Sequence, residues 1–516
     1  MKLLSIFYII LIFLLCIGTT LYVNYDFVNP SAGKWYLGIY ISIIIVIFYL
    51  FYKPYNFISL FIHISAFSTF LLALYGLIQL IWVNYASSEK TIIGNFDNPA
   101  GYASSLCAGF PMILYFFNRS KRYTYCTVFA GLLIVISTIL SDSRAGILSM
   151  ATMIIIWSLL KAKVNKKMLF LLLLGTMLLI SALYLYKKDS ADGRILIWQC
   201  SWEMIKDKPL LGYGTGGFRA NYMNYQAKYF KENPESLYSI LADNINKPFN
   251  EYILLLINYG IVGFSIFLVF VYFLWKSYRR NPCFESKIAL ICLIGIAVFS
   301  CFSYPLSYPF TWVMIILSVY TIIKYANYTI FSSHYVRNFI YLSIICTFSI
   351  AFFRLSEHIL NQFFWTKIAK QSLIRQTNNT FTQYGKLLPK LKNDYLFLYN
   401  YAAELNYGGF YHQSQQIAIQ CHYLLSDYDL QLLIGDNYLK MKKYKKAEEF
   451  FEHAAYMCPN RFIPLSKLMK IYQSKGESSK AIEMAEIILN KSVKIHSETI
   501  KQIKEEARNI ANSLGI

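Results

Sequence analysis

Long apolar runs decide what the first 356 residues of this chain can fold into. Each run approaches the roughly 20 residues that a helix needs to cross a hydrocarbon core about 30 Å thick. Only 15% of the 516 residues are charged and 56% are hydrophobic, which excludes an ordinary soluble protein. We predict an all-α, polytopic membrane protein with about eleven transmembrane helices. The predicted spans are 3–23, 35–52, 57–83, 100–118, 123–141, 145–160, 168–186, 250–275, 286–304, 306–326 and 337–356.

Lysines and arginines in the short connecting segments predict the orientation of these spans. Such residues collect on the cytoplasmic side of a membrane. With a cytoplasmic N-terminus, the inner segments carry fifteen of them and the outer short segments carry three, Lys34, Lys90 and Arg144. We expect residues 3–23 to be a retained helix rather than a cleaved signal. The asymmetry is typical of an integral membrane protein that is surrounded by membrane lipids and has a cytoplasmic N-terminus.

Two large segments then lie outside the cytoplasm: 187–249 and everything after about residue 357. Much of the net charge of +21 is therefore explained by the orientation of the chain in the membrane. No basic patch interleaved with aromatic residues indicates a nucleic-acid partner. Cysteines lack paired C-x-x-C spacing, so we predict neither a metal site nor a disulfide framework.

The polar segment 187–249 is too long for a simple connector, and its length alone makes it a functional candidate. Its central part reads "GRILIWQCSWEMIKDKPLLGYGTGGFRANY". Apolar residues at helical spacing predict an amphipathic helix against the membrane surface, which Pro209 ends. These residues are Ile195, Trp198, Trp202 and Ile205. The four glycines from Gly212 to Gly217 predict a tight turn, but no phosphate-loop pattern accompanies them.

After a helical connector at 357–394, residues 395–516 carry a repeat. In "DLQLLIGDNYLKMKKYKKAEEFFEHAAYMCPN", small and aromatic residues occupy the positions of a tetratricopeptide unit of about 34 residues. Tyr472 and Ala481 repeat Tyr438 and Ala447 one unit later, and Ser414 fits an earlier unit. We predict a small α-solenoid of about three units that binds an unknown protein partner. An unrelated helical domain is the alternative.

Arg144, in "SDSRAG" between two apolar runs, is a candidate ligand for an anion. A cation this close to hydrocarbon is costly unless it is paired or faces water. It could pair with Asp142 or extend to the interface, or it could bind phosphate oxygens, which suit its planar guanidinium group. Lys90, before the turn "GNFDNPAGYAS", and Arg194, in "DGRILIW", lie on two other outer segments.

These motifs together resemble the family of O-antigen ligases and polymerases. "GNFDNPAGYAS" resembles the family's G-x-F-x-N-P-N turn, and "SDSRAG" its S-R-[AG] site. "GRILIWQCSWEMIKDKPLLGYGTGGF" resembles the R-x3-W … P-L-L-G-x-G-x-G-x-F loop, and "PFNEYILLLINYGIVG" the H-N-x-Y-L … G-x-x-G helix entry. The resemblance covers residues 90–265, with the motifs in the family's order.

The resemblance implies that the chain takes a glycan from an undecaprenyl diphosphate carrier and transfers it to an acceptor at the periplasmic face. The acceptor would be a lipid A core for a ligase, a glycan for a polymerase, or a protein for an O-oligosaccharyltransferase. No cofactor or metal is implied, since the lipid diphosphate is itself a good leaving group. Arg144 and Arg194 would bind the diphosphate, and Lys90, Asn98, Arg219 and Asn250 would bind substrate.

One residue departs from the pattern. Where ligases carry a histidine as the implied base, this chain has Phe249, which cannot accept a proton. Glu251 is the first candidate to replace it, with Asp243 also close in sequence, and Asn250 could instead cap the next helix. The missing histidine leaves a non-catalytic scaffold for polysaccharide assembly as the alternative function.

Overall fold

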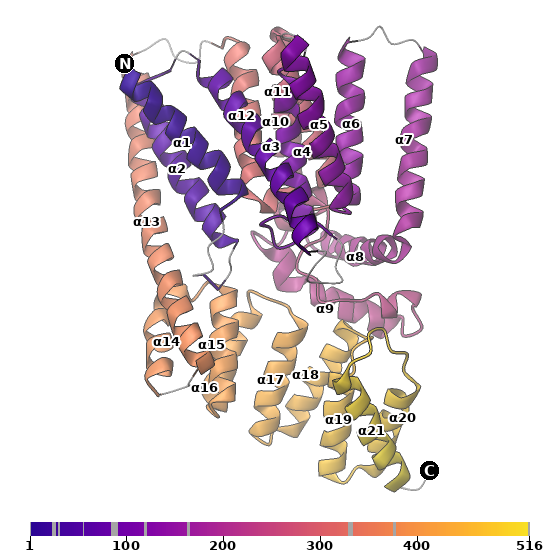
Figure 1. Cartoon of the computed structure of the whole chain (residues 1–516). Coiled ribbons are helices and arrows are strands. Elements are labelled where there is room, and N and C mark those ends of the chain that lie inside the picture. The colour runs from indigo at the N-terminus through magenta and orange to yellow at the C-terminus, as the bar shows by residue number, and fades with distance from the viewer. Residues whose placement is uncertain are drawn as a thin grey trace. The chain divides into compact units, whose positions relative to one another are not determined.

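The computed structural model describes residues 2–22, 27–28, 31–54, 56–83, 91–117, 121–161, 166–328, 334–374 and 378–513. Every regular element in these ranges is helical. The chain divides into two compact units (Figure 1). The first consists of Met1–Leu185, Phe249–Tyr252 and Ser265–Lys367, and the second of Tyr186–Pro248, Ile253–Phe264 and Ile368–Ile516.

The first unit contains the apolar helices, and each of the predicted apolar runs falls on one of them. Residues 253–264 of α10 and 368–374 of α13 belong to the second unit. The helices are α1 Lys2–Thr20, α2 Ala32–Phe51, α3 Phe57–Val83, α4 Pro99–Leu114, α5 Lys121–Leu140, α6 Arg144–Lys161, α7 Lys166–Tyr186, α10 Glu251–Arg280, α11 Phe284–Ser300, η2 Pro305–Ser307, α12 Pro309–Tyr325 and α13 His334–Ile374.

Five stretches within the described residues are long and apolar enough to cross a membrane. They are Ala32–Phe51, Phe57–Ile81, Tyr123–Leu140, Glu251–Arg280 and Tyr335–Ile374. Four shorter apolar helices accompany them: Leu4–Thr20, Arg144–Leu160, Leu174–Tyr186 and Pro309–Tyr325. The chain therefore has membrane helices, and the number of eleven spans stays a prediction.

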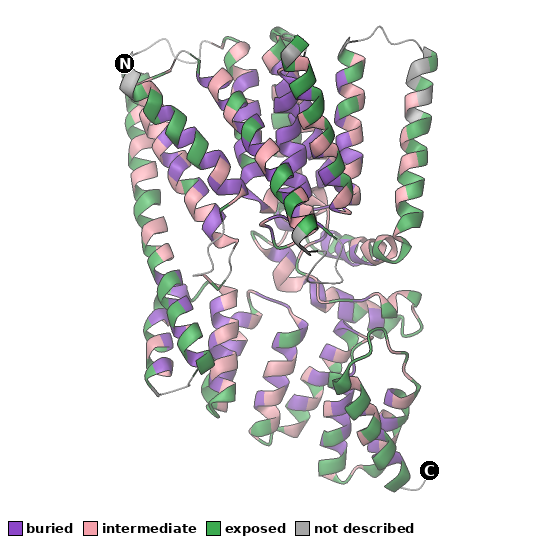
Figure 2. Cartoon of the chain, viewed as in Figure 1, coloured by how far each residue is buried: buried purple, intermediate pink, exposed green. Residues whose placement is uncertain are grey.

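Helix α4 lies at the centre of the first unit and is buried along almost its whole length (Figure 2). Small residues let its neighbours approach closely, as is usual between membrane helices. At Gly109 of α4, any side chain would overlap Thr69 of α3. By contrast, large apolar side chains of α13 face outward, with Phe339 71% and Phe353 73% exposed. Such a surface suits lipid.

Two helices differ from the predicted spans. Helix α13 does not end near residue 356 but continues without a break to Ile374, so the predicted connector begins inside a helix. Helix α10 is not straight, because Gly260 has a non-helical backbone with φ 62° and ψ −164°. The apolar pattern of 250–275 gave no sign of this break, since both halves of α10 are apolar.

The second unit contains the polar segment after α7 and the C-terminal helices. Its helices are α8 Lys188–Asp207, α9 Gly217–Glu232, η1 Leu237–Ile240, α14 Asn378–Leu391, α15 Tyr395–Tyr407, α16 Tyr411–His422, α17 Tyr428–Lys440, α18 Tyr444–Met457, α19 Ile463–Lys475, α20 Ser478–Asn490 and α21 Glu498–Ser513. Helices α15 to α20 pack as three consecutive antiparallel pairs, followed by α21. We call residues 395–513 the repeat helices.

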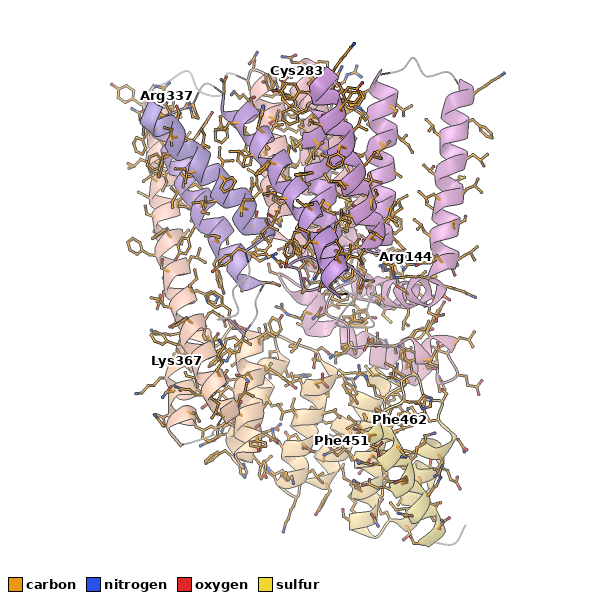
Figure 3. All side chains as sticks on the ribbon, in the orientation of Figure 1. Arg144, Cys283, Arg337, Lys367, Phe451 and Phe462 are labelled. Carbon is orange, nitrogen blue, oxygen red and sulfur yellow. The ribbon has the colours of Figure 1, made fainter. Side chains whose placement is uncertain are left out.

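The predicted repeat positions lie inside these pairs. Gly435 of α17 admits the Phe451 ring of α18, which a Cβ at Gly435 would meet at 2.7 Å. Phe451 belongs to the same buried cluster as Phe462, and both are labelled in Figure 3. Ser414 of α16 donates from Oγ to the Ala402 carbonyl of α15 at 2.7 Å. Small residues thus lie where helices cross, although membership of the tetratricopeptide class stays a prediction.

Candidate functional site

A turn between α11 and α12, residues 301–308, collects three of the predicted site residues in the first unit. Asn98, Asn250 and Glu251 all hydrogen-bond to it. The turn reads "CFSYPLSY", and the tripeptide "SYP" occurs twice in "SYPLSYP", at 303–305 and 307–309. That duplication is a signal for the turn that is visible in the sequence.

Asn98 both caps α4 and bonds to the two tyrosines of this turn. Its Oδ1 accepts from the Gly101 N–H at 3.0 Å, with Pro99 in the first helical turn. The same oxygen accepts from the Tyr308 hydroxyl at 3.0 Å, and Nδ2 donates to the Tyr304 hydroxyl at 3.2 Å. A capping side chain of this kind contributes about 1 kcal/mol to a helix. Asn98 thus fixes the 94–98 turn against 301–308.

Asn250 and Glu251 attach the start of α10 to the same turn. Asn250 donates from Nδ2 to the Cys301 carbonyl at 2.9 Å and accepts at Oδ1 from the Tyr252 N–H at 2.9 Å. The second contact is the predicted cap. Glu251 accepts at Oε1 from the Leu306 N–H at 3.1 Å. Both side chains therefore form hydrogen bonds with backbone groups of the turn. Glu251 is also the first residue of α10.

Phe249, at the position of the family's histidine, has a strained backbone. Its φ of +54° is uncommon for any residue with a side chain and rare for one this bulky. The ring packs edge-on against Tyr304, with 5.3 Å between centroids. Strain of this kind persists only where surrounding contacts fix it, and it concentrates at functional sites.

Lys34, predicted only as one of the outer charges, is a buried cation. Its side chain is 3% exposed, and Nζ donates to the Thr20 carbonyl at the end of α1 at 2.8 Å. Nζ also lies 3.6 Å from the centre of the Phe96 ring. Both a helix C-terminus and an aromatic face attract cations. Lys34 thereby links α1, α2 and the 94–98 turn, and only its position at the start of an apolar run distinguished it in sequence.

Arg144 is the first residue of α6 rather than part of a loop, since only residues 141–143 separate α5 from α6. The preceding Asp142 has φ +58°, which Asp tolerates better than most residues. Arg144 donates from Nη1 to the Leu183 carbonyl of α7 at 3.4 Å. Figure 3 shows Arg144 at the opposite end of the first unit from Arg337, which lies in the first turn of α13.

Arg194 lies on α8 in the second unit, six residues after the helix begins at Lys188. The predicted helix is thus present, with a start earlier than Arg194. Of its four predicted apolar residues only Ile205 is buried, and its place against the membrane surface stays a prediction. Its buried face, which includes Leu196 and Cys200, packs against α9. At the end of α8, Asp207 accepts from the Tyr225 hydroxyl, and Tyr225 in turn contacts the Tyr213 hydroxyl. Arg194 is therefore carried by a helix that α9 supports.

The glycine turn between α8 and α9 pairs with the break in α10. The N–H groups of Tyr213 and Gly214 donate to the carbonyls of Ile257 and Asn258, both at 2.8 Å. In return, the Ile261 N–H donates to the Pro209 carbonyl at 2.8 Å. The turn thereby satisfies the backbone groups that the kink leaves without helical partners. Two sequence motifs about 45 residues apart form one structure.

Arg219, a predicted substrate ligand, contacts the C-terminal part of the second unit. It lies on α9, where Nε donates to the Leu424 carbonyl at 3.5 Å and the guanidinium group lies 3.9 Å from the centre of the Tyr395 ring. Both partners belong to the repeat helices or the loop after α16. Asp243, the second candidate base, forms an ion pair with Arg461 at 2.9 Å. These two charges therefore face the repeat helices.

Lys90 lies outside the described residues. Within the described ranges, no group of three or more histidine, cysteine or acidic side chains is arranged to hold a metal ion.

One family comparison bears on this arrangement. Residues 129–268 match the family model of O-antigen ligase. A comparison with curated proteins finds no match. The O-antigen ligase match begins within α5 and ends within α10, so it contains Arg144, Arg194 and Glu251. With the apolar helices, it supports a bacterial membrane protein with a role in surface polysaccharide or glycan transfer.

The O-antigen ligase match leaves two predicted residues outside its range. Lys90 and Asn98 precede it, and so does the whole 94–98 turn. The repeat helices follow it and are not covered. Arg219 and Asn250 lie inside it, together with the paired glycine turn and kink.

Proposed function

We propose that this protein transfers a glycan from an undecaprenyl diphosphate carrier to an acceptor hydroxyl at the periplasmic face of the inner membrane. The observation that carries the proposal is the O-antigen ligase match, because it contains both candidate arginines and the candidate base. Membrane helices on either side of 187–249 are consistent with a lipid-linked donor. The N-terminus is cytoplasmic and the repeat helices are periplasmic in this proposal.

The reaction requires one bond to form and one to break at the anomeric carbon. The acceptor oxygen attacks that carbon, and the electron pair of the breaking bond moves to the diphosphate oxygen. Arg144 and Arg194 would stabilise the negative charge that develops there, as fixed cations do in a site of low dielectric. Arginine suits this role because its planar group donates two parallel hydrogen bonds to phosphate.

The acceptor proton needs a base, and Phe249 cannot supply one. Glu251 takes this role in our proposal, since a carboxylate lies two residues further on at the start of α10. Asn98 and Asn250 then shape the site by fixing the 301–308 turn, rather than by binding sugar alone. Lys90 stays a candidate for the diphosphate, and Arg219 is the weakest of the predicted ligands because of its contacts with Leu424 and Tyr395.

Transfer by purified protein in lipid tests the proposal. The assay follows loss of a lipid-diphosphate-linked oligosaccharide and gain of glycosylated acceptor, with lipid A core, free glycan and protein acceptors offered separately. We expect Arg194→Ala to lower the rate by about 100-fold or more, the usual effect of removing one stabilising donor. Arg337→Ala, which removes an exposed arginine at the opposite end of the first unit from Arg144, is the matched control.

Glu251→Gln tests the proposed base, and turnover by the wild-type protein separates the two proposed functions. Loss of transfer with donor binding retained supports Glu251 as the base. If wild-type protein binds the lipid-linked donor yet converts none of the acceptors, the non-catalytic scaffold for polysaccharide assembly replaces the enzyme. Phe249 is the observation that favours that second function.

A further inference from the structure

The repeat helices bind the segment that follows the glycine turn. This segment, residues 217–248, comprises α9, η1 and the stretch that runs into Phe249. Helix α9 packs against α18. Side chains from the loops after α16 and α18 also bond to it. The contact joins residues about 200 positions apart, and it lies wholly within the second unit.

Gln226 is at the centre of this contact and is completely buried. Its Nε2 donates to the Met457 carbonyl at the end of α18 at 2.7 Å and to the Asp243 carbonyl at 3.0 Å. Its Oε1 accepts from the Tyr222 hydroxyl at 2.7 Å. A buried amide with both ends bonded holds its partners in one geometry, because any other arrangement leaves polar groups without partners.

Asn224, one half-turn earlier on α9, makes a second contact of the same kind. Its Oδ1 accepts from the Ser426 hydroxyl at 3.0 Å and from Nε2 of His453 at 3.0 Å. An amide oxygen can only accept, so His453 donates here and is held in one tautomer. Burial lowers the pKa of His453, and the nearby His422 and Lys231 lower it further.

At the edge of the contact, two asparagine side chains form hydrogen bonds with backbone groups. Asn460 donates from Nδ2 to the carbonyls of Ile240 at 3.0 Å and Ala242 at 2.7 Å. Asn244 donates to the Asp427 carboxylate at 2.8 Å and accepts from the Tyr428 N–H at 3.2 Å. The segment is therefore bonded to the repeat helices along its length, from Arg219 to Asn244.

The same polar chain continues from α9 to α8. The Tyr222 hydroxyl, which donates to Gln226, also contacts the buried Cys200 thiol of α8, whose pKa burial raises to about 12. Helix α8 carries Arg194, six residues before Cys200. A continuous set of contacts thus leads from Met457 through Gln226 and Tyr222 to the helix of Arg194.

We infer that the repeat helices are a working part of the transfer site, and that Gln226 is a positioning residue that acts through Arg194. This inference rests on the proposed function. The repeat helices hold α9, α9 holds α8, and α8 sets the position of the Arg194 guanidinium group. On this view the repeat helices do not serve only to recruit a separate partner.

Gln226→Leu in the full-length protein tests the inference. Leucine keeps much of the volume and removes every hydrogen bond of the amide. Asn437→Leu is the matched control, because Asn437 is also a fully buried amide. Its bonds to Ser414 and Asn406 join repeat helices to one another only. We expect Gln226→Leu to lower kcat/KM by about tenfold or more, with a change below about twofold for Asn437→Leu.

A double variant distinguishes positioning from general damage. If Gln226 acts through Arg194, then Gln226→Leu has no further effect on the residual rate of Arg194→Ala. Equal fold-losses in both backgrounds would overturn the inference. Hydrogen–deuterium exchange of α8 and α9 should be faster in Gln226→Leu and unchanged in Asn437→Leu. Faster exchange with unchanged transfer would also overturn it, because the contact would then hold α9 without affecting chemistry.

Two further outcomes are informative. If Gln226→Leu does not fold, Asn460→Ala removes two contacts at the edge, and Asn406→Ala is its control within the repeat helices. If wild-type protein transfers no glycan, the proposed function fails on its own. Binding of the lipid-linked oligosaccharide by wild type, Gln226→Leu and Arg194→Ala then tests positioning, and equal affinities would overturn it.

Discussion

Replacing Gly260 with alanine should separate the glycine turn from the break in α10. Its backbone, with φ 62° and ψ −164°, lies in a region that is essentially restricted to glycine. A Cβ would overlap the Leu210 carbonyl and lie 2.7 Å from the Leu211 nitrogen. Both are backbone atoms, so no side chain can rotate away to relieve the overlap. The two segments 209–214 and 257–262, which are in contact, must move apart instead.

The magnitude follows from strain and from lost hydrogen bonds. An unfavourable backbone region costs about 1–3 kcal/mol. Separation also breaks the bonds from Ile261 N–H to Pro209 and from Val262 N–H to Leu210, at 2.8 and 3.2 Å. Each contributes about 0.5–1.5 kcal/mol, so the total destabilisation should be about 2–6 kcal/mol.

Two matched glycines isolate the cause. Gly214 also has positive φ, at +83°, but a Cβ there would meet no atom within 4 Å, so Gly214→Ala should cost only about 1–2 kcal/mol. Gly193 lies inside α8 with open space around it, and Gly193→Ala should stabilise by about 0.5–1 kcal/mol.

The assay measures the apparent melting temperature in detergent and the labelling rate of the buried Cys200 thiol, resolved by peptide mass spectrometry. Gly260→Ala should melt lowest and label fastest, followed by Gly214→Ala, wild type and Gly193→Ala. If Gly260→Ala and Gly214→Ala behave alike, the overlap with Leu210 does not matter and the reasoning is wrong.

Three further predictions concern single contacts. Asn98→Ala removes the α4 cap and both tyrosine contacts, and should lower stability by at least about 1 kcal/mol, measured by melting temperature; Asn98→Asp, which can still cap, should lose less. Phe451→Ala should cost about 3–5 kcal/mol by leaving a cavity in the repeat helices, whereas the exposed Tyr423→Ala should be nearly neutral by the same measurement. Burial, aided by His422 and Lys231, holds the folded-state pKa of His453 below 6.5. Stability should therefore fall as the pH drops through about 6.5. Melting temperatures measured between pH 7.5 and pH 5 should fall less in His453→Gln than in wild type.

The local chemistry of the chain was enough to predict its helices. Apolar runs near the length of a bilayer crossing can satisfy their backbone groups only within themselves, so each became a helix. The pattern Asn98-Pro99 predicted a helix start, and the spacing of Ile195, Trp198 and Trp202 predicted α8. These signals depend on neighbours within a few residues, which a sequence displays directly.

The candidate site could be predicted only in part from the sequence. The surroundings of each charged side chain depend on residues that are distant in the chain. Arg194 and Arg219 look alike in sequence, yet Arg219 contacts Tyr395 and Leu424 of the repeat region. Lys34 gave no sign of its burial between Thr20 and Phe96. Sequence shows the type of a side chain, but the cost of its charge depends on what folds around it.

The sequence by itself determined that this chain forms apolar and amphipathic helices, a glycine turn and paired C-terminal helices. Only the tertiary structure decided that the turn fits the break at Gly260, and that Gln226 joins α9 to Met457, 231 residues away. The physical reason is that hydrogen-bond partners and burial depend on which distant segments meet. An ordinary glutamine in a polar segment acquires a role only once both of its ends are enclosed.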